Sequence, residues 1–228
     1  AGETSLIQLT SAYSSFINGG RKIKPSLIDR IQDRRGKNIY LENFSKCTNC
    51  DDPYIEESSK PDLVDTYERT FDEAKSYQMV SILKGAVDRG TGRKTKIDGI
   101  EIAGKTGTTN NNTDAWFIGF TSNLVVGVYV GHDTPKSLGK IETGSKAAMP
   151  IFKEFIKNSI NNYEARPFKV AKGIKMMVVD SVTGEKADFG SKKTLIESFK
   201  EEKIENMSNI VIDNLTNNES KNNILKFY

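Results

Sequence analysis

The sequence is poor in the residues that carry metal and redox chemistry. Its 228 residues include one histidine, His132, and two cysteines, Cys47 and Cys50. A structural zinc site takes four ligands, so this set does not predict a metal centre. The cysteines stand in a polar stretch, without the strand and helix that flank a thioredoxin-type redox pair. We interpret them as a small disulfide or two spare thiols, and we expect neither a metal nor a cofactor.

A charge imbalance and a long apolar run are also absent. Lys and Arg total 33 against 30 Asp and Glu, which argues against a nucleic-acid partner. No apolar run approaches the length that spans a bilayer. The chain has no initiator Met, and the residues after Ala1 read as part of a helix. We therefore expect a segment of a larger protein.

The residues that are present predict an α+β fold, an antiparallel sheet packed by helices. Apolar residues at three- to four-residue spacing predict helices over 6–17 and 147–163, and another after the capping box 70–73. A hairpin is predicted over 26–42. The polar, aperiodic segment 44–62 is predicted to be a loop.

Three consecutive strands are predicted after the second helix. They cover 99–109, 114–121 and 124–130, and the last two are separated by a two-residue hairpin connection. The third strand is apolar on both faces, so we expect it at the centre of the sheet. Residues 174–184 predict one more hairpin. Few apolar anchors follow, so 166–228 is expected to be an extension that is partly mobile, most of all over its last residues.

The segment from Gly99 to Thr108 fits two incompatible patterns. Its first eight residues match G-x-x-x-x-G-K-[ST], a phosphate-binding loop. From Lys105 onward it reads Lys-Thr-Gly, the third signature of the penicillin-binding and β-lactamase serine enzymes. A phosphate loop needs a buried strand before its first Gly and a helix opening at the Lys-Thr. Charged residues precede Gly99 and Gly, Thr and Asn follow Thr106, so we favour a strand that carries Lys105.

Each residue of that strand suits a site for a peptide carboxylate. Lys105 supplies positive charge, either for the carboxylate or for the proton network of a serine–lysine pair. Gly107 lets a second extended backbone approach closely. Thr106 and Thr108 offer hydroxyl groups to the carboxylate, and the backbone N–H of Thr108 would form half of an oxyanion hole. We therefore predict Lys105 and Thr108 as catalytic residues, and Thr106, Gly107 and Thr108 as substrate-binding residues.

Further motifs follow one another along the chain, at 3–6, 12–20, 89–93, 103–109, 114–120, 131–133 and 147–151. Together they resemble the class A penicillin-binding proteins of the 1A type. The resemblance implies that residues 1–165 are the C-terminal portion of a transpeptidase domain, with 44–62 as an insertion. The expected fold is then part of the β-lactamase/transpeptidase fold.

The resemblance also implies a function for the parent protein. It would be a bifunctional peptidoglycan synthase with a glycosyltransferase domain upstream, anchored in the bacterial inner membrane and facing the periplasm. Its D,D-transpeptidase domain would cross-link stem peptides through a serine acyl-enzyme, which β-lactams would trap. The membrane anchor is expected outside this chain.

Two signatures of the family are not credible here. Ser81-Ile-Leu-Lys84 matches Ser-x-x-Lys, but it lies in the middle of a predicted helix, whereas a nucleophile belongs at a helix N-terminus. Ser159-Ile-Asn161 matches Ser-x-Asn, but it follows Lys105, out of family order. We expect the nucleophile upstream of Ala1, so this chain alone should be inactive. Apolar surface left uncovered by the missing half could drive homodimerisation.

Other readings stay open. The chain could be a non-catalytic module that binds peptidoglycan or a partner protein through the Lys-Thr-Gly strand. The basic residues Arg89, Arg93, Lys94 and Lys96 form either a solvated turn or a rim that attracts carboxylates. For Trp116 we favour core packing over a substrate groove, and for His132 a loop-capping role over a general base.

Overall fold

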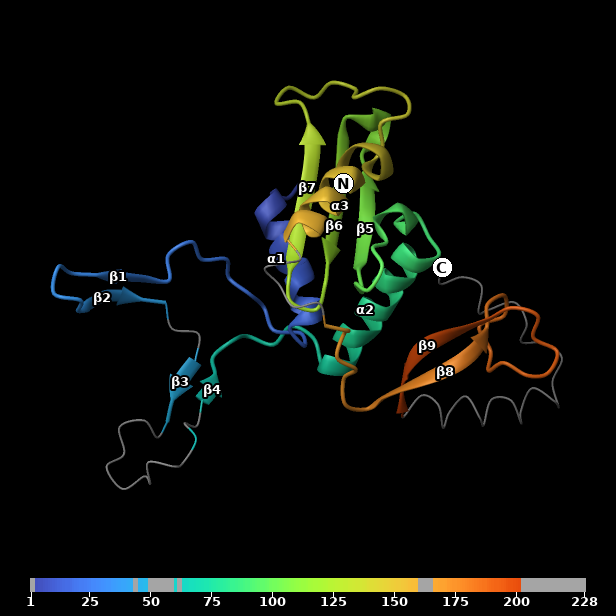
Figure 1. The fold of residues 1–228 in the computed structure, drawn as a ribbon, viewed down its shortest axis with the longest axis horizontal. Helices are drawn as coiled ribbons and strands as arrows, with labels where there is room; N and C mark the ends of the chain where they lie inside the picture. Colours follow the sequence, from blue (N-terminus) through green and yellow to red (C-terminus); the bar gives the residue numbers. More distant parts are fainter. Residues whose placement is uncertain (1–2, 43–44, 49–59, 61–62, 160–165, 202–228) are drawn as a thin grey trace.

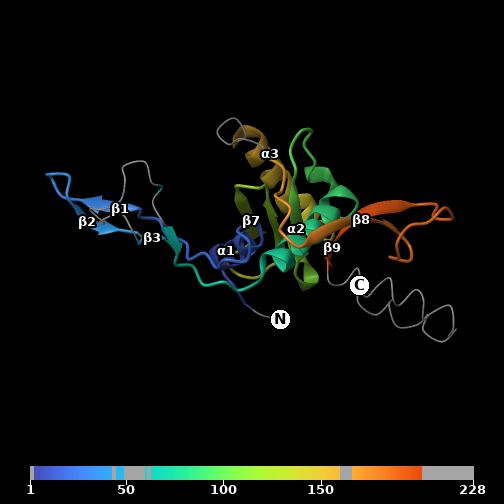
Figure 2. The same ribbon diagram turned by 90° about the horizontal axis from the view of Figure 1, so that it is seen from below.

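The computed structural model describes residues 3–42, 45–48, 60, 63–159 and 166–201. Its centre is a three-stranded antiparallel sheet flanked by helices, shown in Figure 1 and, from below, in Figure 2. The predicted α+β fold is confirmed. Within the described ranges, no helix is long and apolar enough to cross a membrane.

The first helix, α1 (Leu6–Ile17), begins with a capping box. The Ser5 hydroxyl accepts from the Gln8 N–H, and the Gln8 side chain accepts from the Ser5 N–H. The expectation that the chain opens inside a helix is wrong over the described residues 3–5, because Ser5 is the N-cap. Asn18 is the C-cap, and Gly19 follows with a φ of 62°, as the sequence predicted for this helix end.

The second helix, α2 (Glu73–Asp88), begins later than predicted. The capping box at Thr70 is wrong, because the N-cap is Asp72, whose carboxylate accepts from the Lys75 N–H at 2.7 Å. The Thr70 N–H instead donates to the Gly20 carbonyl at 2.7 Å and ties this segment to the end of α1. The predicted apolar stripe packs toward the sheet, and its most buried members are Val80, Leu83 and Val87.

The third helix has an unexpected first turn. A π-helical turn, η3 (Gly144–Ala148), leads into α3 (Met149–Ser159), so helical structure begins three residues before the predicted start at 147. Pro150 is the second residue of α3 and follows the π-helical turn directly. The remainder of the predicted helix, 160–163, lies outside the described residues.

The sheet consists of β5 (Ala103–Thr108), β6 (Asp114–Phe120) and β7 (Val125–Gly131), in that order. The Thr121 N–H donates to the Leu124 carbonyl at 2.9 Å, which closes the predicted two-residue turn between β6 and β7. The prediction that the third strand is central is wrong, since β6 is central in the described sheet and β7 is at an edge. β7 is apolar on both faces because α1 and α3 both contact it.

β5 also begins later than predicted. The Ile100 N–H donates to the Ile97 carbonyl at 3.2 Å, and Gly99 between them has a φ of 78°. Residues 97–100 therefore form a tight turn, and the strand starts only at Ala103. Because Lys105 lies in this extended strand and not at a helix N-terminus, the phosphate-loop interpretation is excluded.

The core has two parts, one on each face of the sheet. Phe117 points toward α3 and meets Phe152, with ring centroids 4.8 Å apart. Phe120 points to the opposite face, because it stands three positions after Phe117 in the strand, and it packs with Val80 and Leu83 of α2. The two clusters pack β6 between α3 on one face and α2 on the other. β5 is hydrogen-bonded to β6, so the position of β6 determines that of β5.

Two small hairpins stand away from this body in Figure 1. β1 (Arg30–Gln32) and β2 (Asn38–Leu41) pair antiparallel, as predicted for 26–42, and both strands are exposed. β3 (Ser45–Cys47) pairs with β4 (Leu63–Asp65), so the predicted loop 44–62 is wrong at 45–47. A three-residue strand is too short to show a period in sequence. Cys50 and residues 49–59 lie outside the described residues, and the pairing of Cys47 stays a prediction.

The last hairpin consists of two longer strands, β8 (Ile174–Asp180) and β9 (Thr194–Lys200). It confirms the predicted hairpin, although its return strand starts beyond residue 184. The hairpin docks on α2, where the Gln78 amide donates to the Ser198 carbonyl at 3.1 Å. Lys200 pairs with the Asp72 carboxylate at 3.0 Å. Residues 202–228, where most mobility was predicted, lie outside the described residues.

Asp72 should make folding stability sensitive to acid. Hydrogen bonds from the Lys75 N–H, Lys200 and the Lys75 ammonium lower the pKa of Asp72 to about 2, from an ordinary 3.8. A carboxyl with a lowered pKa stabilises the fold fully above its ordinary pKa and loses that contribution as pH falls toward the folded value. Asp72→Asn keeps a capping oxygen but not the charge, so its thermal midpoint should fall at neutral pH. Between about pH 4 and about pH 2 the variant should lose less than the wild type; parallel curves would contradict this.

Candidate functional site

The backbone register turns two residues of β5 toward the edge away from β6. The Thr109 N–H donates to the Asp114 carbonyl at 3.1 Å, and the pairing of β5 with β6 is regular along the whole strand. Hydrogen-bonded pairs in an antiparallel ladder occur at every second residue. The backbone N–H and carbonyl groups of Thr106 and Thr108 therefore point to the outer edge of β5. No other described strand pairs with that edge.

Lys105 brings a positive charge to the same edge. Its ammonium group donates to the Thr106 carbonyl at 2.9 Å, one of the outward-pointing backbone groups. The side chain is exposed, and it makes no ion pair with any residue that the structure describes. The outer edge of β5 thus carries both the positive charge of Lys105 and the outward-pointing N–H of Thr108.

The two threonine hydroxyls of β5 have partners from different elements. The Thr106 hydroxyl lies 3.1 Å from the Thr91 hydroxyl, in the turn after α2. The Thr108 hydroxyl accepts from the backbone N–H of Gly144, the first residue of η3, at 3.0 Å. Neither Thr91 nor Gly144 was predicted as a site residue, although Thr91 lies in the family motif 89–93.

Gly107 is enclosed on one face. Gly144 is buried, and a Cβ on it would overlap the carbonyl oxygens of Gly107 and Trp116. A Cβ on Gly107 would lie 3.2 Å from the Cβ of Trp116, its partner across β6. The sequence predicted that Gly107 lets a second backbone approach closely. On this face the backbone of η3 already lies against Gly107, so a substrate backbone would approach along the open edge of β5.

An aromatic pair and a carboxylate close the far end of the strands. The Trp116 ring lies 4.7 Å from the Tyr129 ring between centroids, and Trp116 is half-buried. The Tyr129 hydroxyl donates to Asp114 at 2.8 Å, and this bond lowers the pKa of the Asp114 carboxyl. Asp114 also accepts from the Thr109 hydroxyl at 3.1 Å, so it joins the β5–β6 turn to β7.

Two of the four basic residues predicted as a rim form ion pairs with described residues, and two do not. Arg89 pairs with Glu197 of β9, and Lys96 pairs with Asp88 at 3.3 Å. Arg93 and Lys94 are exposed and make no ion pair with any described residue. Half of the cluster is therefore neutralised locally, and half remains as a positive rim beside Thr91.

The match to Ser-x-x-Lys lies within α2, and the match to Ser-x-Asn begins at the last residue of α3. Ser81 is in the middle of α2, and Lys84 pairs with Asp88 at 2.7 Å along the same helix. Ser159 is the last described residue of α3, and Asn161 lies outside the described residues. His132 is exposed just after β7. Within the described residues, no group of three or more His, Cys, Asp or Glu side chains could hold a metal ion.

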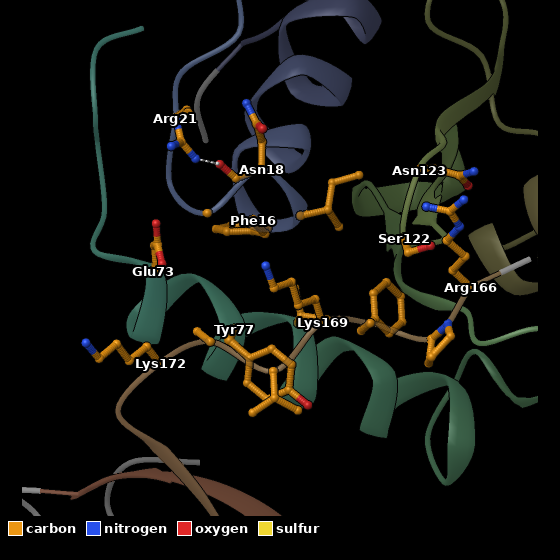
Figure 3. Close-up of a pocket in the computed structure, with 17 residues that line it drawn as sticks. Phe16, Asn18, Arg21, Glu73, Tyr77, Ser122, Asn123, Arg166, Lys169 and Lys172 are labelled. Atoms are coloured by element: carbon orange, nitrogen blue, oxygen red, sulfur yellow. Dashed lines mark hydrogen bonds between the residues drawn. The ribbon is translucent and has the colours of Figure 1, made fainter. Parts of the chain in front are cut away.

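A cavity of about 900 Å³ lies at the other end of the sheet (Figure 3). It is bounded by α1, α2 and the segment 166–172, with Lys169 pointing into the space between the two helices, and it reaches Ser122 in the β6–β7 turn. That turn follows the end of β6 that pairs with the start of β5, whereas Thr108 ends β5. The cavity is therefore not part of the candidate site.

Bacterial proteins named penicillin-binding protein 1A align with most of this chain. Penicillin-binding protein 1A of Rickettsia prowazekii (strain Madrid E) is 44% identical over 219 residues, which are 93% of this chain and 27% of that protein. Penicillin-binding protein 1A of Neisseria flavescens is 35% identical over 175 residues, 76% of this chain and 20% of the relative. This chain thus spans between a fifth and about 28% of the length of the relatives it matches.

A solved structure and a family match agree with these relatives. The crystal structure of Penicillin-Binding Protein 1A from Haemophilus influenzae superimposes with a TM-score of 0.69 at 28% identity, covering 85% of this chain and 32% of that one. The family described as penicillin binding protein transpeptidase domain matches residues 3–157. Since that match includes more than half of the sequence, this chain belongs to the penicillin-binding protein transpeptidase family.

Proposed function

We propose that this chain is the Lys-Thr-Gly portion of a serine D,D-transpeptidase of the penicillin-binding protein 1A type. The observation that carries the proposal is the outer edge of β5, where the Lys105 ammonium and the Thr108 N–H lie together. An extended stem peptide would bind along this edge as an added strand. Lys105 would supply charge, and the Thr106 and Thr108 hydroxyls would bind the terminal carboxylate.

The chemistry is acyl transfer from a D-alanyl-D-alanine terminus. A serine oxygen attacks the carbonyl of the penultimate residue, the peptide bond to the terminal D-alanine breaks, and the serine proton passes to the leaving amine. An amine of a second stem peptide then attacks the acyl carbonyl, the ester bond to the serine breaks, and the amine proton returns to the serine oxygen. The Thr108 N–H would stabilise the oxyanion in both steps. A β-lactam would enter the same edge and leave the serine acylated.

The remaining parts of the machinery would come from the rest of the protein. Lys84 is bound to Asp88 and not to Ser81, which supports a nucleophile outside this chain. We also propose a glycosyltransferase domain upstream and a position on the periplasmic face of the bacterial inner membrane, with the anchor outside these residues. The exposed apolar residues of β1 and β2 would then meet the rest of the protein. In its absence they would favour a homodimer, which sedimentation of this chain would detect.

Labelling with a fluorescent penicillin on a denaturing gel tests the proposal. The 228-residue chain should not label, whereas a longer protein that contains it together with its upstream Ser-x-x-Lys segment should label. Ser81→Ala should leave that labelling unchanged. Labelling of the short chain that Ser81→Ala abolishes would make Ser81 the nucleophile. If neither protein labels, the strand acts in a non-catalytic peptidoglycan- or partner-binding module instead.

A further inference from the structure

Thr91 is held rigidly beside β5. The Gly92 N–H donates to the Ala86 carbonyl at 2.9 Å and so folds the turn back on α2. The Thr95 hydroxyl donates to the Gly92 carbonyl at 2.7 Å, and Thr95 is completely buried. Thr91 itself is exposed. A fixed turn therefore places an exposed hydroxyl against the Thr106 hydroxyl.

The Thr108 hydroxyl is oriented in a different way. A threonine hydroxyl has one proton to donate and two lone pairs that accept. Thr108 uses a lone pair for the Gly144 N–H, so its proton remains available to another group. The position of Gly144 is set by the buried residues Ala148 and Met149 that continue η3 into α3. Among the described residues, no acceptor for the Thr108 proton is recorded.

Thr106 and Thr108 point to the same face, two residues apart along β5, or roughly 7 Å. A carboxylate with a hydrogen bond of about 2.7 Å to each oxygen spans a gap of this size. If the Thr91 hydroxyl donates to Thr106, the Thr106 proton is also available. The two hydroxyls then act as a pair of donors, and Arg93 and Lys94 on the neighbouring turn favour an anion there.

We propose that Thr91 is a positioning residue that presents the Thr106 hydroxyl, together with that of Thr108, as paired hydrogen-bond donors to the carboxylate of the acyl donor. This inference rests on the proposed function, because it assumes that the strand binds a carboxylate-bearing substrate. Thr91 does not touch the reacting atoms. It acts through Thr106, and its effect should depend on the charge of the ligand.

The test uses the longer protein that contains this chain and two ligands, benzylpenicillin and its methyl ester, which lacks the carboxylate. The second-order rate constant of acylation is measured for the wild type, Thr91→Val, Thr91→Ser and Thr183→Val. Thr183 is an exposed threonine between β8 and β9, a hairpin that does not pair with β5, and serves as the matched control. Thermal midpoints of all four proteins are measured in parallel.

Thr91→Val should lower the rate constant for benzylpenicillin by about fivefold to tenfold, the effect of one weakened hydrogen bond. It should change the rate with the ester by less than about twofold. Thr91→Ser, which keeps the hydroxyl, should retain the wild-type rate constant for benzylpenicillin, and so should Thr183→Val. An equal loss with both ligands would mean that Thr91 has a structural role alone and overturns the inference, as would an unchanged rate with benzylpenicillin. A wild-type protein that neither ligand acylates would defeat the proposed function, and the inference with it.

Discussion

Lys105→Ala in the longer protein should reduce the second-order rate of penicillin acylation by about a hundredfold or more. Loss of one charged or donor group at an acyl-transfer site costs this much because it is preorganised where charge develops. Lys105 is the charged residue of β5. Its ammonium group lies at the outer edge of the strand, where it donates a hydrogen bond to the Thr106 carbonyl. Stopped-flow or gel-based labelling rates measure the loss directly.

The fold should survive this substitution. The Lys105 side chain is exposed, and exposed substitutions usually change the free energy of unfolding by less than about 0.5 kcal/mol. Lys186→Ala is the matched control, since Lys186 is an exposed lysine of the β8–β9 hairpin. It should label at the wild-type rate. A Lys105→Ala protein that keeps more than about a third of the wild-type rate would remove Lys105 from the site.

Phe152→Ala should lower the free energy of unfolding of the chain by about 3–5 kcal/mol. Phe152 is completely buried against Phe117, and both rings lie over Gly119, where a Cβ would overlap them. Removing the ring leaves a cavity that the rigid β6 backbone cannot close. The effect should also reach the candidate site, because α3 is continuous with η3, whose Gly144 holds the Thr108 hydroxyl.

Phe155→Ala provides the control on the same helix. Phe155 is 47% exposed, so its removal should cost no more than about 1 kcal/mol. Urea unfolding followed by circular dichroism compares the two variants on the same chain length. Equal midpoints for Phe152→Ala and Phe155→Ala would contradict the assignment of Phe152 to the core.

Local patterns in the sequence determined most of the elements and the strand of interest. The apolar spacing of α1 and α2, the two-residue turn before Leu124 and the hairpin β1–β2 all depend on residues close together in the chain. The extended conformation of Lys105 followed in the same way, since its flanks are unsuited to a phosphate loop. The family resemblance, carried by motif spacing, is confirmed by relatives that are 44% identical.

Tertiary structure alone decided the features that depend on distant residues. The central position of β6 and the pairing of β3 with β4 each depend on which segment lies alongside, which periodicity does not encode. The tight turn at Gly99, which delays the start of β5, was hidden because Ile100 and Ile102 alternate as in a strand. Thr91 stands 15 residues from Thr106 in the sequence, and Gly144 stands 36 residues from Thr108, yet each pair is in hydrogen-bond contact. The sequence by itself therefore determined the strand that carries the chemistry, and the packing of α2 and η3 against that strand decided which groups orient its hydroxyls.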